Sequence, residues 1–90
     1  MQGNEFYNKG INTVLSPNLN VMRSPLARRN WEGFRDDPYL IGIMGTQIIK
    51  GLQDSGVIAV DKHYANYNQE LFRKCAGIRI NKVSLWEKFY

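Results

Sequence analysis

Apolar residues in the two halves of the chain form short runs that predict β-strands. Residues 11–16 contain three aliphatic side chains directly after Gly10, a residue that favours a turn. Residues 57–60 form an uninterrupted apolar run, Val-Ile-Ala-Val, which is typical of a strand covered on both faces of a parallel sheet. Both segments are therefore predicted to be short, buried strands.

A helix is predicted between these runs, over residues 38–54. It begins at Asp37-Pro38, where a carboxylate can accept from free backbone N–H groups and proline fits the first helical position. Ser55-Gly56 is a typical helix end. Four apolar residues recur at every fourth position and predict one apolar face: Leu40, Met44, Ile48 and Leu52.

Three glycines within this helix, Gly42, Gly45 and Gly51, each lower helix propensity by about 1 kcal/mol relative to alanine. We therefore expect the helix to approach another backbone closely. A last short helix is predicted over residues 83–90, with Asn81 or Ser84 as its cap.

Strand, helix and strand together predict one βαβ unit and an α/β fold. Ligands of parallel sheets bind at the carboxyl ends of the strands, where the connections to the helices emerge. Residues 18–37 and 61–73 are those connections, and both contain basic and aromatic residues. The two clusters should therefore face one opening.

Composition and charge narrow the function classes. The 90 residues suit one small domain or part of a larger one, and 43% hydrophobic residues argue against disorder. The net charge is +4, but the 12 Lys and Arg are dispersed among acids, so no nucleic-acid partner is predicted. Cys75 is the only cysteine in the sequence, which excludes an internal disulfide. His63 is the only histidine, and its spacing from Cys75 matches no metal-ligand motif.

Targeting signals are not evident in the sequence. No basic segment followed by an apolar run occurs near Met1, so no signal peptide is predicted. No apolar window reaches the roughly 18 residues of a membrane span, so no membrane partner is expected either. The compartment and the oligomeric state are left open.

Several motifs carry a resemblance to a known family. They are Arg29-Asn30-Trp31-Glu32, Asp37-Pro38-Tyr39-Leu40, Lys62-His63-Tyr64 and Asn68-Gln69-Glu70-Leu71-Phe72-Arg73. In this order and spacing they resemble the N-terminal (β/α)8 domain of glycoside hydrolase family 3, in its fungal-type β-glucosidase branch. The resemblance implies that residues 1–90 are a fragment of that domain, a partial TIM barrel of about two βα units.

Site residues follow from the resemblance by position. It implies that four cationic or imidazole side chains contact the hydroxyls of the sugar in subsite −1, while Glu32 and Glu70 orient those groups. The four are Arg29, Lys62, His63 and Arg73. No metal or organic cofactor is implied. Taken singly, each arginine would be read as a solvated surface group and a lone histidine as a hydrogen-bonded structural residue.

Lys62 and His63 impose a geometric condition on this interpretation. Adjacent residues of a regular strand point to opposite faces, so both side chains can reach one ligand only if the strand breaks between them. We therefore predict a strained or cis peptide within residues 61–64.

Retaining glycosidases need two carboxylates about 5–5.5 Å apart, a nucleophile and an acid, and neither can be placed in this sequence. The leading hypothesis is a β-glucosidase that hydrolyses terminal non-reducing β-D-glucosyl residues of β-glucosides or cello-oligosaccharides, with this chain a truncated part. The alternatives are a non-catalytic fragment with weak or no sugar binding, and a small basic interaction protein related only by ancestry. Members of the family are often secreted.

Overall fold

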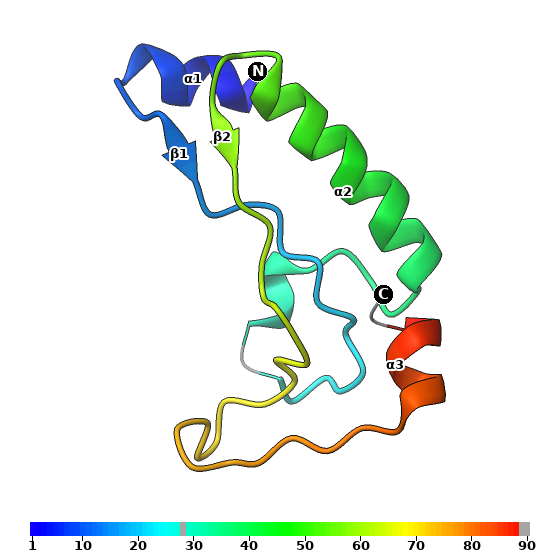
Figure 1. Cartoon of the computed structure of the whole chain (residues 1–90). Helices are drawn as coiled ribbons and strands as arrows, with labels where there is room; N and C mark the ends of the chain where they lie inside the picture. The colour runs from blue at the N-terminus through cyan, green and yellow to red at the C-terminus, as the bar shows by residue number, and fades with distance from the viewer. Residues whose placement is uncertain (28, 89–90) are drawn as a thin grey trace.

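The structure is a computed structural model that describes residues 1–27 and 29–88 (Figure 1). Strands β1 (Thr13–Val14) and β2 (Ile58–Ala59) pair in parallel, with Thr13 opposite Ile58. Helix α2 (Pro38–Gln53) connects them and packs along β2. The described elements thus form an α/β arrangement, and the predicted βαβ unit is confirmed. The remaining elements are α1 (Gln2–Asn8), the 3-10 turn η1 (Asn30–Glu32) and α3 (Lys82–Lys88).

Helix α2 begins and ends close to the predicted residues. Asp37 Oδ1 accepts hydrogen bonds from the backbone N–H groups of Tyr39 and Leu40, at 2.9 and 3.4 Å. At the other end Gly56 adopts a φ of +80°, in the left-handed region that glycine enters without steric cost. Both ends of α2 were therefore predictable from the residues next to them.

The core lies where α2 meets β2. Val57, Leu52 and Ile41 are only 1%, 2% and 4% exposed. The strands themselves are shorter and more exposed than predicted, and the expectation of burial on both faces is wrong: Ile58 and Leu15 are 59% and 66% exposed. The reason is that α2 covers one side of the strands, so side chains directed to the other side remain open to solvent (Figure 1). Met44, predicted on the apolar face of α2, is also exposed.

A Cβ added to any of the three glycines of α2 would not come close to another backbone. A Cβ built on Gly42 or Gly51 meets nothing within 4 Å, and one on Gly45 would lie 2.5 Å from Leu19 Cδ2, a side-chain atom. The close backbone approach occurs instead at Gly3 of α1, where a Cβ would lie 3.0 Å from the Gly51 carbonyl oxygen. The predicted proximity therefore exists, but a glycine outside α2 creates it.

Replacing Gly3 with alanine should destabilise the fold by about 1–3 kcal/mol, because the added methyl group would clash with Ser55 and the Gly51 carbonyl. The matched control is Gly42→Ala on the open side of α2, which should gain up to about 1 kcal/mol of helix propensity. Urea denaturation of both variants measures the two effects. A Gly3→Ala midpoint at or above that of the wild type would contradict the packing of α1 on α2.

Helix α3 begins at the predicted cap: Asn81 Oδ1 accepts from the Ser84 N–H at 2.8 Å. It ends at Lys88, and residues 89 and 90 of the predicted helix lie outside the described residues. α3 contains no buried residue. Within the described parts of the chain, no helix combines the length and the apolar composition needed to cross a membrane.

Candidate functional site

The connections that follow β1 and β2 remain paired beyond the strands. The Leu19 N–H donates to the Lys62 carbonyl at 2.7 Å, and the Lys62 N–H donates to the Pro17 carbonyl at 3.0 Å. These two bonds hold the connections side by side at the carboxyl ends of the strands (Figure 1). The prediction that both connections face one opening is confirmed.

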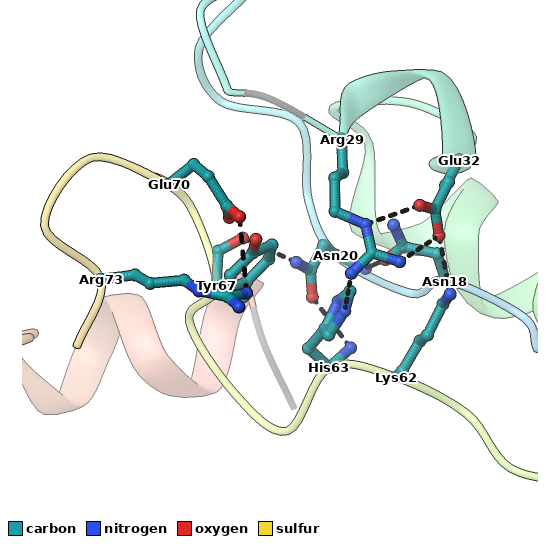
Figure 2. A network of polar contacts seen from close by, with 9 residues as sticks. All are labelled: Asn18, Asn20, Arg29, Glu32, Lys62, His63, Tyr67, Glu70 and Arg73. Atoms are coloured by element: carbon teal, nitrogen blue, oxygen red, sulfur yellow. Dashed lines mark hydrogen bonds and ion pairs between the residues drawn. The ribbon is translucent and has the colours of Figure 1, made fainter. Parts of the chain in front are cut away.

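Glu32 is the centre of a compact ionic cluster at this opening (Figure 2). Its carboxylate accepts two bonds from Arg29, from Nε at 2.6 Å and from Nη2 at 3.0 Å. It also pairs with Lys62 Nζ at 2.7 Å. The 3-10 turn η1 makes the first pairing possible, because it places Arg29 and Glu32 three residues apart on one side of a single turn. The Glu32 side chain is only 13% exposed.

This geometry sets the charge state of the cluster. Hydrogen bonds from Arg29 and then Lys62 lower the pKa of Glu32 to about 2. The hydrogen bond to Glu32 in turn raises the pKa of Arg29 above its ordinary value. Glu32 is therefore an ionised acceptor at neutral pH and has no proton to give.

His63 adds an imidazole to the cluster. Its Nε2 lies 3.3 Å from Arg29 Nη1, and because a guanidinium only donates, Nε2 must accept and the proton resides on Nδ1. Burial, followed by the nearby charges of Arg29 and Lys62, lowers the pKa of His63. The ring also packs against Tyr67, with centroids 4.5 Å apart. His63 is thus held neutral and in one orientation.

The Lys62–His63 peptide bond is cis, and so is Tyr64–Ala65. The predicted break in the extended backbone is therefore confirmed. In Figure 2 Lys62 points toward Glu32 and His63 toward Arg29, so both reach the same cluster, which a regular strand would not allow.

Asn20 is a residue of the site that the sequence analysis missed. Its Oδ1 accepts from the His63 N–H at 3.1 Å, and its Nδ2 donates to the Tyr67 carbonyl at 2.6 Å. Asn18 Oδ1 in turn accepts a hydrogen bond from the Asn20 N–H at 3.0 Å. The signal was the pair of asparagines directly after Pro17 at the end of a strand, where polar side chains meet a ligand or the neighbouring connection.

Arg73 stands apart from the other three predicted residues. It pairs with Glu70 at 3.4 Å, and its side chain is 51% exposed. The charge of Glu70 also acts on Arg29. It raises the pKa of Arg29, although less than Glu32 does. The structure thus brings Arg29, Lys62 and His63 together, whereas Arg73 lies beside Glu70 (Figure 2).

A hollow of about 660 Å³ lies in front of Lys62 and His63. Its lining comes from four parts of the chain, namely the two strand connections, the start of α2 and helix α3. Among the described residues, no group of three or more His, Cys, Asp or Glu is placed to hold a metal ion. The site consists of the Glu32 carboxylate with its cationic partners, the His63 imidazole, amides and aromatic rings.

Comparisons with known proteins agree with the pattern of these residues. The family described as "Glycosyl hydrolase family 3 N terminal domain" matches residues 1–74. The β-glucosidase cel3A of Pyricularia oryzae is 51% identical over 73 residues, which cover 80% of this chain and 10% of that protein. The probable β-glucosidase F of Aspergillus fumigatus is 51% identical over 72 residues, 79% of this chain and 8% of the relative.

β-Glucosidase 1 of Aspergillus aculeatus is 49% identical over 75 residues, 82% of this chain and 9% of its own length. The chain therefore spans a tenth or less of the length of these curated relatives. No solved structure matches it. Because the family match covers most of its residues, the chain belongs to the glycosyl hydrolase family 3 N-terminal domain family.

Proposed function

We propose that this chain forms part of the glucosyl-binding surface of a β-glucosidase, an enzyme that releases terminal non-reducing β-D-glucosyl units from β-glucosides or cello-oligosaccharides. In this proposal residues 1–90 are about two βα units of a (β/α)8 barrel. Family membership and the relatives named as β-glucosidases support it. The observation that carries it is the cluster in which Glu32 holds Arg29 and Lys62 beside His63.

The cluster suits a sugar because its donors are fixed and only partly used. Lys62 Nζ has three N–H groups, and it pairs with one oxygen of Glu32. His63 lies beside this donor, with its proton on Nδ1, a buried atom without a hydrogen-bond partner in the described structure. Charge-assisted bonds from a preset donor such as Lys62 select strongly for hydroxyls at matching positions. Glu32 acts by orienting Arg29 and Lys62.

Arg73 and Glu70 complete the proposed surface. Their pairing at 3.4 Å repeats the relation of Arg29 to Glu32, an arginine held by a carboxylate three residues away. We assign Arg73 to sugar hydroxyls and Glu70 to its orientation. The larger exposure of the Arg73 side chain leaves its guanidinium accessible to a ligand.

The chain binds in this proposal and does not cleave. A glycosidase acid must carry a proton, whereas Glu32, with a pKa of about 2, is ionised at neutral pH. Its oxygens are also occupied by Arg29 and Lys62, which leaves it unsuited to attack an anomeric carbon. We therefore assign neither the nucleophile nor the acid to these residues, and no metal or organic cofactor takes part.

Methyl β-D-glucopyranoside should bind the 90-residue chain saturably and perturb the NMR signals of His63 and Lys62. Lys62→Met should abolish those changes, because it removes the ammonium and its link to Glu32. Lys9→Met is the matched control, since Lys9 forms an exposed pair with Glu5 on α1 and should have no effect on binding.

Turnover is measured in parallel with 4-nitrophenyl β-D-glucopyranoside, from which we expect no 4-nitrophenolate. Release of nitrophenolate by the wild type and not by Lys62→Met would show that the chain itself is an enzyme. The absence of saturable perturbation in a folded wild-type chain would refute the binding proposal and favour a fragment without sugar affinity.

A further inference from the structure

We propose that Asn20 is a positioning residue of the glucosyl site, whose side-chain amide holds both ends of residues 63–67 and so fixes the direction of the His63 imidazole beside Lys62. The inference rests on the proposed function and adds a residue to it. Asn20 itself touches no sugar in this proposal, because it acts through His63.

Backbone pairing between the two strand connections stops at the edge of the site. The Leu19 N–H donates to the Lys62 carbonyl at 2.7 Å. One residue further along each connection, the side-chain Oδ1 of Asn20 accepts from the His63 N–H at 3.1 Å. The Asn20 N–H donates to Asn18 Oδ1 at 3.0 Å, which fixes the backbone from which this side chain extends. Asn20 thus continues the pairing into the residue that carries the imidazole.

The same amide also holds the far end of the segment. Its Nδ2 donates to the Tyr67 carbonyl at 2.6 Å (Figure 2). A backbone N–H only donates and a carbonyl only accepts, so the two partners leave the amide one orientation. Between these two bonds the chain folds back, and the rings of His63 and Tyr67 pack with centroids 4.5 Å apart. One planar amide of Asn20 therefore supports this ring contact from both ends.

Through His63 the amide acts on the ionic cluster. The imidazole Nε2 accepts from Arg29 Nη1 at 3.3 Å, and Arg29 is held by Glu32 at 2.6 Å. A neutral imidazole free in water carries its proton on either nitrogen, whereas one held against a guanidinium carries it on Nδ1. Without the Asn20 bonds the ring could move away from Arg29, and a displacement of about 1 Å weakens a preset site strongly. Asn20 should therefore raise sugar affinity without contacting the sugar.

Replacing Asn20 with alanine should weaken binding of methyl β-D-glucopyranoside about tenfold. Asn20→Asp keeps the shape and the acceptor for the His63 N–H but loses the donor to the Tyr67 carbonyl, so it should weaken binding less, about threefold. Asn12→Ala is the matched control, because the exposed Asn12 side chain accepts only from its neighbour Thr13 at 3.2 Å among the described contacts. It should bind like the wild type.

The imidazole nitrogens give a readout that a merely structural role would not move. His63 is the only histidine, so its ¹⁵N signals are unambiguous at about pH 8 without sugar. The wild type should show a proton fixed on Nδ1, and Asn20→Ala should show averaged shifts of two exchanging tautomers. Gly3→Ala destabilises the fold at a distance from the site and should keep the wild-type shifts. Lost stability alone therefore would not produce the change.

The outcomes separate this inference from the proposed function. If the wild type binds and a folded Asn20→Ala chain keeps either the wild-type affinity or the wild-type His63 shifts, the positioning role is refuted and the glucosyl site stands. If Asn20→Ala does not fold, the same two measurements on Asn20→Asp decide. If a folded wild type does not bind, both proposals fall.

Discussion

Replacing Glu32 with glutamine should weaken binding of methyl β-D-glucopyranoside on the order of 30-fold. Glutamine has nearly the same shape, but it removes the charge that holds Arg29 and Lys62 at 2.6 and 2.7 Å. The two cations would then repel each other beside His63, and the donors would lose their fixed positions. Isothermal titration calorimetry measures the change.

Glu5→Gln is the matched control for this substitution. Glu5 also accepts a bond of 2.6 Å from a lysine, but in an exposed pair on α1 that contacts none of the site residues. The control should bind sugar like the wild type. Equal affinities of Glu32→Gln and the wild type would show that the cluster does not position the sugar donors.

Acidification should reduce the free energy of unfolding in two successive ranges of pH. The pKa of His63 is lowered in the folded chain, so below its ordinary value of 6.5 the unfolded chain takes up a proton first. The pKa of Glu32 is about 2 when folded against 4.5 ordinarily, so the unfolded state again binds more protons between these values. Both contributions are complete above 6.5 and are lost as the pH falls.

Two variants assign these ranges to their residues. His63→Gln should show a smaller loss than the wild type just below pH 6.5, and Glu32→Gln a smaller loss between pH 4.5 and 2. Urea midpoints at about pH 7.5, 5.5 and 3.5 test both differences. If His63→Gln followed the wild type throughout, the lowered pKa of His63 would be contradicted.

Features encoded by adjacent residues were predictable from the sequence. Asp37-Pro38 and Gly56 set the ends of α2 through hydrogen bonds and backbone conformations that need no distant partner. The parallel pairing followed from strand, helix and strand in succession. The break between Lys62 and His63 was predictable because two neighbouring side chains were expected to reach one ligand.

Features that depend on distant contacts were missed. Helix α1 contains Gly3 and two asparagines, which are poor helix formers, and it is stabilised by packing against α2. Asn20 reaches partners more than 40 residues away, at His63 and Tyr67, and the asparagines that follow Pro17 do not reveal which distant residues they bind. Exposure of the strands was missed because burial depends on which layers cover them.

The pairing of Arg29 and Lys62 on one carboxylate makes the site a product of long-range chain closure. The contacts that define it join residues 30 to 47 positions apart, across the whole length of α2. Closing a chain segment of that length has an entropic cost before any of these contacts forms. The site should therefore assemble late in folding, and its amides should exchange with solvent deuterium before those in the interior of α2.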